Sequence, residues 1–144
     1  MISAASVLVC ALEVLGRASA TLPPIELVAV APRHASAHVE AFVPPGGRTI
    51  FLLTSSAVFE AARDSQCRDL NAVKKLASIL VHEQWHVRYG DDERGAYEAQ
   101  LAALLRFGVD PGSALYYGVV RSMAAVLAAR SRGGADRIAA ANLR

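Results

Sequence analysis

The segment over residues 72–89 limits the fold of this chain more than any other feature of its sequence. At about 100° per residue, its apolar side chains fall on nearly every side of a helix, so that helix must lie inside the protein. Three polar residues, His82, Glu83 and His86, occur close together near its C-terminal end. Buried polar groups without partners destabilise a fold by several kilocalories per mole. The three residues therefore need a common partner, and a metal ion would satisfy all of them.

The spacing of these three residues is typical of a hydrolytic zinc site. His82 and His86 lie about 40° apart on one face of a helix, which brings one nitrogen of each within reach of a single zinc ion. Glu83 then lies beside the ion without binding it. From there its carboxylate can accept a proton from a water molecule whose pKa zinc lowers to about 7. The helix thus offers two metal ligands and one general base.

Residues 82–86, HEQWH, match the HExxH signature of the zincin metallopeptidases. The order of the preceding elements also resembles the zincin order, in which a small sheet comes before the active-site helix. The resemblance implies that His82 and His86 bind zinc and that Glu83 is the general base. The metzincin branch has a third histidine six residues after the second, where this chain has Asp92, and no histidine follows His86. The metzincin branch is therefore excluded.

The next segment resembles the gluzincin branch instead. Gluzincins take their third ligand from a glutamate on the following helix, in the pattern Glu-x-x-(Ala/Ser)-Asp, and residues 93–97, ERGAY, resemble this pattern. The resemblance implies that Glu93 is the third zinc ligand, with Tyr97 in place of an aspartate that orients the first histidine. We expect Tyr97, or Gln100 one turn later, to contact that histidine instead. The short connection between the two helices is similar to that of miniature bacterial gluzincins.

A second glutamate competes for the position of third ligand. In a tight hairpin of two helices, residues near 97 and 98 come level with the two histidines, and this geometry favours Glu98. The motif favours Glu93, so Glu93 is the predicted ligand and Glu98 its alternative. Asp91 or Asp92 is expected to cap the following helix rather than to bind the metal.

Chain length and residue pattern predict a single α+β domain over residues 1–144, and the resemblance to zincins implies the architecture of a minimal zincin. Three segments are predicted as strands of a small sheet, because their apolar residues cluster or alternate between turn residues: 25–31, 37–43 and 48–54. Residues 44–47, PPGG, form a strong turn. The last two strands are therefore expected to pair as an antiparallel hairpin.

Helical patterns resume after the sheet. A short helix over residues 57–63 precedes the buried helix, which Asp69 or Asn71 can cap. Gly90 ends the buried helix, and a glutamate-bearing helix follows over residues 93–107. The connection between these two helices is short, so they are expected to form a tight antiparallel hairpin.

The last helix is predicted to begin within the sequence VDPG. Asp110 is its expected cap and Pro111 its first residue, and the helix is expected to end near Ser131, before two glycines. Residues 133–144 are expected to form a flexible tail. The arginines close to the C-terminus are expected on a solvated helix end rather than in a binding patch.

The N-terminal segment over residues 1–22 favours an amphipathic helix over a secretory signal. Its apolar stretch is followed by the sequence ASA, as in a signal peptide, but no basic residue precedes the stretch and Glu13 interrupts its end. No apolar run reaches the roughly 20 residues that a membrane span needs. A cytoplasmic protein is therefore expected, with secretion as the alternative if residues 1–20 act as a signal.

The cysteines and the net charge argue against other classes of protein. Cys10 and Cys67 are too few and too far apart in sequence for a disulfide scaffold or a Cys-based zinc site. We expect free thiols, which favour a reducing compartment. The net charge of +2 provides no field that would recruit nucleic acid. His34 and His38 are expected on the surface, because the pattern around them is that of loop and strand.

These features predict a zinc-dependent peptidase that holds one zinc ion and acts on a peptide or protein. As the resemblance to zincins implies, an edge strand of the sheet can hold an extended substrate by strand addition. The alternative is a zinc-stabilised helical module that binds a partner protein without catalysis. An open coordination position that faces Glu83 distinguishes the enzyme, whereas a closed site of four ligands distinguishes the module. The sequence indicates neither the cleavage specificity nor the oligomeric state.

Overall fold

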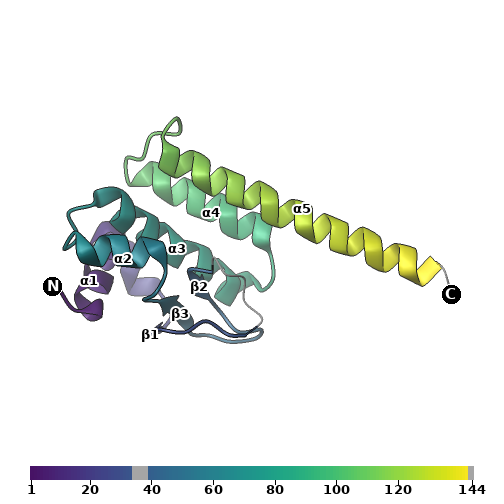
Figure 1. Ribbon diagram of the computed structural model, residues 1–144, viewed down its shortest axis with the longest axis horizontal. Helices are drawn as coiled ribbons and strands as arrows, with labels where there is room; N and C mark the ends of the chain where they lie inside the picture. Colours follow the sequence, from purple (N-terminus) through teal and green to yellow (C-terminus); the bar gives the residue numbers. More distant parts are fainter. Residues whose placement is uncertain (34–38, 143–144) are drawn as a thin grey trace.

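The computed structural model describes residues 1–33 and 39–142 of the chain, with side chains up to Gly133 (Figure 1). The described residues form five α-helices and one small mixed sheet, so the predicted α+β class is confirmed. Along the chain the elements are α1 (Ala4–Leu15), the 3-10 helix η1 (Gly16–Thr21), β1 (Ile25–Val28), β2 (Ala41–Phe42), β3 (Ile50–Leu53), α2 (Ala57–Asp64), α3 (Leu70–Tyr89), α4 (Glu93–Arg106) and α5 (Ala114–Asn142).

The sheet has the strand order β1-β3-β2, with β3 in the centre. β3 pairs in parallel with β1 and antiparallel with β2, so the predicted hairpin of the last two strands is confirmed. Ile50 and Leu52 of β3 have no exposed surface and belong to the main hydrophobic core. The first residues of the strand predicted over 37–43, together with His34 and His38, lie outside the described part of the chain.

α3 is the central helix of the fold, as its apolar sequence predicts. α1, α2 and the sheet pack against it, and α4 runs beside it (Figure 1). Leu76 and Leu80, in its middle turns, have no exposed surface. The helix begins at Leu70, where the side chain of Asp69 accepts a hydrogen bond from a backbone N–H of the first turn at 3.1 Å. It ends at Tyr89, and the next residue, Gly90, reverses the chain with a φ of 74°.

The start of α5 differs from its prediction. The helix begins at Ala114 rather than at Pro111. The side chain of Asp110 accepts a hydrogen bond from the backbone N–H of Gly112 at 2.7 Å, so it stabilises a turn instead of capping the helix. The side chain of Ser113 accepts a hydrogen bond from a backbone N–H of the first turn at 3.2 Å and takes the capping position.

The end of α5 also differs from its prediction. The helix continues to Asn142 instead of ending near Ser131, so helical backbone replaces most of the tail that was expected over residues 133–144. A glycine weakens a helix interior by only about 1 kcal/mol relative to alanine, and the alanine-rich sequence that follows favours a helix. The second half of α5 extends beyond the rest of the molecule (Figure 1).

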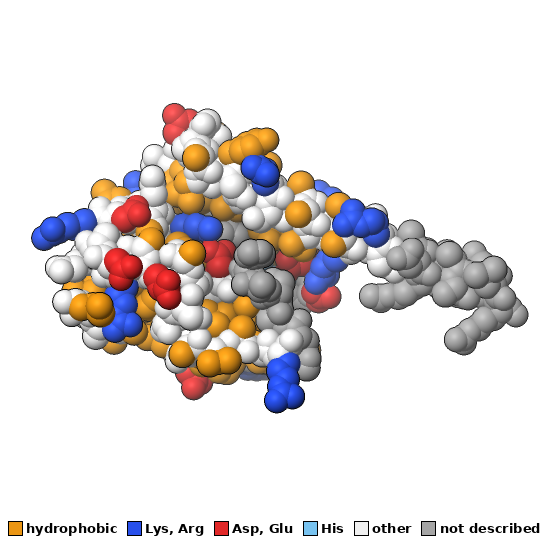
Figure 2. Space-filling view, in the orientation of Figure 1, with side chains coloured by type: hydrophobic (Ala, Val, Ile, Leu, Met, Phe, Trp, Pro, Cys, Tyr) orange, Lys and Arg blue, Asp and Glu red, His pale blue; other side chains and the backbone are white. Residues whose placement is uncertain are grey.

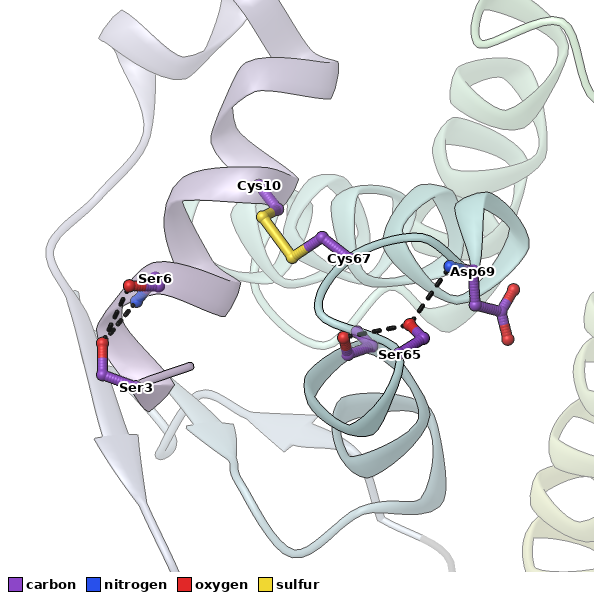
Figure 3. The surroundings of a disulfide bond; sticks show 7 residues. Ser3, Ser6, Cys10, Ser65, Cys67 and Asp69 are labelled. Carbon is purple, nitrogen blue, oxygen red and sulfur yellow. Dashed lines mark hydrogen bonds between the residues drawn. A yellow bond between two sulfur atoms is a disulfide. The ribbon is translucent and has the colours of Figure 1, made fainter. Parts of the chain in front are cut away.

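Cys10 and Cys67 form a disulfide bond, so the prediction of free thiols is wrong (Figure 3). The bond joins α1 to the loop between α2 and α3, and its Cα atoms lie 6.5 Å apart despite a sequence separation of 57. Gln66 and Cys67 have positive φ angles, which turn this loop back toward α1. Disulfides are typical of oxidising compartments, so the basis for expecting a reducing one is removed.

α1 packs onto the body of the protein through Val7 and Ala11, which have no exposed surface. By length and composition alone, the segment Ala4–Thr21 could also cross a membrane, since its mean hydropathy is 1.4. Signal sequences and core helices of soluble proteins pass the same criterion, so this is weak evidence for a membrane span. The expectations about membrane and compartment therefore stay predictions.

Candidate metal centre

His82, His86 and Glu93 come together where α3 ends and α4 begins. The two histidines lie on consecutive turns of α3, and the tight turn at Gly90 brings Glu93, the first residue of α4, back against them. One ligand atom from each side chain lies within 4.8 Å of the other two. A single metal ion can therefore contact all three predicted ligands.

Hydrogen bonds at the outer nitrogen of each histidine ring direct the inner nitrogen into the centre. His86 donates from Nδ1 to the carbonyl of Gly90 at 2.8 Å, and His82 donates from Nδ1 to Oε1 of Gln100 at 2.9 Å. Each ring therefore keeps a lone pair on Nε2, and the two Nε2 atoms lie 3.2 Å apart. Oε1 of Glu93 lies 2.5 Å from Nε2 of His86 and 3.8 Å from Nε2 of His82. Three atoms with lone pairs converge on one point, which requires a shared positive charge.

A proton supplies that charge when no metal is bound. Burial lowers the pKa of His86, but its hydrogen bonds to Glu93 and to the carbonyl of Gly90 outweigh burial and raise the pKa to about 9. Burial raises the pKa of Glu93, but both histidines overcome it and hold this pKa well below its usual range. The proton on Nε2 of His86 therefore occupies the place that a metal ion would take.

Metal affinity is expected to increase with pH. Because the pKa of His86 is about 9 in the metal-free protein, an ion that binds at lower pH must displace a proton. Each pH unit below 9 is therefore expected to weaken apparent binding by up to about tenfold. Competition with a chelator between about pH 6 and pH 8 measures this slope. An affinity that stays constant over the range would contradict the arrangement.

Glu83 lies beside the three ligands and does not belong to their group. Glu83 is 7% exposed, and no fully buried side-chain oxygen among the described residues lacks a partner, so its carboxylate reaches the solvent of the cleft. Burial raises the pKa of Glu83. The charges of His82 and His86 lower this pKa and the charge of Glu93 raises it, so the net effect is an increase. Glu83 also lines the same cleft as the ligands. A carboxylate in these surroundings accepts a proton more readily than an exposed one.

Gln100 and Tyr97, the two predicted neighbours of the first histidine, both contact His82 from α4. Gln100 accepts the hydrogen bond from His82 and donates one from its amide nitrogen to Oγ of Ser78 at 3.2 Å. The hydroxyl of Ser78 donates in turn to the carbonyl of Lys75 at 2.7 Å. The ring of Tyr97 packs edge-on against the imidazole, with centroids 4.5 Å apart. Burial and nearby carboxylates raise the pKa of Tyr97 to about 12, so its phenol stays protonated. A neutral chain of hydrogen bonds therefore fixes the orientation of His82.

Sequence analysis missed three residues that support this centre. Ser78 is fully buried four residues before His82, and a lone polar residue on an apolar helix face is the signal that could have identified it. Trp85 donates from Nε1 to Oδ2 of Asp92 at 3.0 Å and so ties α3 to the start of α4. A Cβ atom at Gly95 would lie 2.5 Å from Nε1 of Trp85, so only glycine lets the two helices approach this closely.

The other acidic residues that sequence analysis considered, Glu98, Asp92 and Asp91, are not part of the ligand group. Glu98 is exposed on α4 and is not part of the ligand group, so Glu93 is the carboxylate that the fold brings to the histidines. Asp92 caps α4, as predicted, by accepting a hydrogen bond from a backbone N–H at 3.1 Å. Asp91 forms an ion pair with Arg130 of α5 at 2.6 Å, and the hydrogen bond within this pair lowers the pKa of Asp91.

A cleft of about 1200 Å³ opens over the ligand group. Its lining comes from α3 and α4, from the edge strand β2 and the turn after it, and from α5. Figure 2 shows hydrophobic, acidic and basic side chains together beneath α5. Small-molecule pockets have volumes of about 300–1,000 Å³, so a cleft of this size can hold a peptide segment.

No protein-family model, curated protein or solved structure matches this chain. Its function must therefore be inferred from its own motif and geometry. These provide a group of metal ligands, a buried carboxylate beside them and a cleft that reaches both.

Proposed function

We propose that the protein is a zinc-dependent peptidase of the gluzincin-like type, with His82, His86 and Glu93 as zinc ligands and Glu83 as general base. The observation that carries this proposal is the convergence of two histidine nitrogens and one carboxylate oxygen on one point, beside a second carboxylate that lines the same cleft. The sequence HEQWH supports it, as does the order of sheet, histidine-bearing helix and glutamate-bearing helix, since both resemble the zincins.

The separation of the two histidine nitrogens fits a zinc ion. Zn–N bonds of about 2.0–2.1 Å in a tetrahedron place two ligand nitrogens about 3.3 Å apart, and the Nε2 atoms of His82 and His86 are 3.2 Å apart. Two imidazoles and one carboxylate are also a typical ligand set of catalytic zinc, whereas calcium and magnesium prefer oxygen ligands. The same three ligand types hold iron(II) in some oxygenases, but a buried carboxylate such as Glu83 suits hydrolysis.

The residues around the zinc position have separate tasks in the proposed reaction. Zinc, when bound, would polarise the peptide carbonyl and lower the pKa of a water molecule to about 7. Glu83 accepts the proton of the attacking water, and its raised pKa suits this transfer. The same carboxyl group then passes the proton to the departing amine nitrogen. Gln100 and the carbonyl of Gly90 hold the two histidine rings in place.

A three-ligand site fits catalysis better than it fits the alternative, a zinc-stabilised interaction module. Structural zinc sites are usually closed by four protein ligands, whereas catalytic sites keep one position for water or substrate. Among the residues that the structure describes, three side chains form the ligand group, and the cleft gives access to it. We therefore favour the enzyme.

β2 offers a means of holding an extended substrate across the zinc position. It is an edge strand, and its residues line the cleft. The carbonyl of Glu40 accepts a hydrogen bond from the N–H of Leu53 in β3 at 3.0 Å. Because hydrogen-bonding direction alternates along an antiparallel pair, the backbone groups of Ala41 point away from β3. A substrate peptide can pair with this free edge by strand addition.

Elemental analysis of tag-free protein tests the ligand set. We expect one zinc ion per chain in the wild type, affinity weaker by more than about 100-fold in Glu93→Ala, and unchanged zinc in Glu98→Ala. Peptide hydrolysis measured on the same preparations should follow the zinc content. Loss of zinc from Glu98→Ala alone would reverse the ligand assignment. A wild type that holds no zinc even after its addition would overturn the proposal.

A further inference from the structure

We propose that Ser78 is a positioning residue that selects which nitrogen of His82 is free to bind a metal ion. This role rests on the zinc site of the proposed function and not on its peptidase activity. A neutral imidazole carries its proton on either Nδ1 or Nε2, and only the Nδ1–H form leaves a lone pair on Nε2. A residue that favours the Nδ1–H form of His82 therefore prepares the site for its metal.

The two histidines are held by different kinds of partner. His86 donates from Nδ1 to the carbonyl of Gly90 at 2.8 Å, and a backbone carbonyl only accepts, so it keeps the proton on Nδ1. Nδ1 of His82 instead contacts the side-chain amide of Gln100 at 2.9 Å. An amide accepts through its oxygen but donates through its nitrogen, so the same amide turned over would favour the Nε2–H form. Gln100 alone therefore does not determine which form His82 adopts.

Ser78 sets the orientation of this amide. Its hydroxyl donates to the carbonyl of Lys75 at 2.7 Å, within α3, so its oxygen can only accept from its other neighbour. That neighbour is the amide nitrogen of Gln100, at 3.2 Å. The nitrogen of Gln100 therefore faces Ser78, and its oxygen faces His82. A backbone carbonyl thus acts on His82 as well, through two side chains.

The opposite direction of this chain has one hydrogen bond fewer. If the amide were turned over, Ser78 would donate its single proton to Gln100 and would lose the carbonyl of Lys75. Three hydrogen bonds would become two, and one hydrogen bond changes an equilibrium by up to about tenfold. Without the hydroxyl of Ser78, each direction keeps one hydrogen bond, between Gln100 and His82. Ser78 therefore adds a preference for the Nδ1–H form that Gln100 does not supply by itself.

Burial keeps water from replacing these partners. Ser78 has no exposed surface, and Gln100 is 4% exposed. Ala96 and Ala103, about one turn to either side of Gln100 on α4, have no exposed surface either. Buried polar groups find their partners within the protein, and no fully buried side-chain nitrogen or oxygen among the described residues lacks one. The protein alone therefore sets the direction of the chain.

Zinc affinity, measured by competition with a chelator, tests this role in the wild type, Ser78→Ala, Gln100→Glu and the double variant. Ser78→Ala is expected to weaken zinc binding by up to about tenfold. Gln100→Glu is expected to make the serine dispensable, because a carboxylate only accepts and holds the Nδ1–H form in either orientation. In that background Ser78→Ala should cost less than about twofold. Equal losses in the two backgrounds would make Ser78 a packing residue and overturn the proposal.

Ser65→Ala is the matched control (Figure 3). The hydroxyl of Ser65 donates to the carbonyl of Ala62, three residues earlier, at 3.2 Å, as that of Ser78 does to Lys75. Ser65 lies at the end of α2, so its replacement should leave zinc affinity unchanged. A loss as large as that of Ser78→Ala would overturn the proposal. If Ser78→Ala does not fold, Ser78→Cys replaces it, because a thiol is a weak acceptor in the same position.

Nitrogen-15 NMR of the histidine rings in zinc-free protein measures the two forms of His82 without relying on the proposed function. Ser78→Ala is expected to raise the ratio of the Nε2–H form to the Nδ1–H form by up to about tenfold. His86 and Glu93 also influence this ratio, but they are the same in the wild type and the variant. An unchanged ratio would overturn the role of Ser78 whether or not zinc binds. A raised ratio in a protein that binds no zinc would support the role of Ser78 and reject the zinc site.

Discussion

Replacement of Glu83 with glutamine is expected to reduce peptide hydrolysis by about 10²–10⁴-fold while the zinc ion stays bound. The amide has nearly the same size as the carboxyl group, but it cannot accept a proton from the attacking water. Glu83 does not belong to the ligand group, so one zinc ion per chain should remain. Steady-state hydrolysis and elemental analysis of the same preparation measure the two quantities together.

Glu98→Gln is the control for this experiment, because it makes the same chemical change on the exposed side of α4. It is expected to change neither hydrolysis nor zinc content. Glu83→Gln should not destabilise the protein either. Burial raises the pKa of Glu83 in the folded state, so its ionised form opposes folding above that pKa, and the amide removes this effect. Retained hydrolysis would place the base elsewhere, and loss of zinc would make Glu83 a ligand.

The metal centre could be predicted from the sequence because its geometry is local. Helix periodicity alone places His82 and His86 on one face of α3, whatever surrounds them. The choice between Glu93 and Glu98 depends on the turn at Gly90. This turn places the first residue of α4, Glu93, beside the two histidines. The two glutamates lie about 140° apart around α4, so both cannot face the centre.

Contacts between distant segments could not be predicted in this way. The pairing of Cys10 with Cys67 depends on how α1 packs and on two loop residues with positive φ. No periodic pattern in the sequence indicates the packing of α1 or these φ angles. The part of the cleft that α5 lines depends on the register of α5, which the ion pair between Arg130 and Asp91 helps to set. The strands, most of the helices and the two histidines thus follow from local patterns, whereas the disulfide and the cleft follow from tertiary packing.

Removal of the disulfide is expected to lower the free energy of unfolding by about 4 kcal/mol. A cross-link across 57 residues restricts the unfolded chain, and the loop-closure relation gives about 14 cal/mol/K for this length, or about 4 kcal/mol at room temperature. Urea unfolding of the double variant Cys10→Ser/Cys67→Ser against the wild type measures the difference. The double variant leaves no unpaired thiol, so it isolates the loss of the bond.

Reductant provides the control for the disulfide prediction. It should lower the stability of the wild type to that of the double variant and leave the double variant unchanged. Two titratable thiols in the unreduced wild type would contradict the bond.

Zinc content should stay the same without the disulfide, because His82 lies twelve residues after the start of α3, about 18 Å along the helix axis. Val7 and Ala11 of α1 are buried beside the bond, so amide exchange should rise in α1 before it rises at the metal centre.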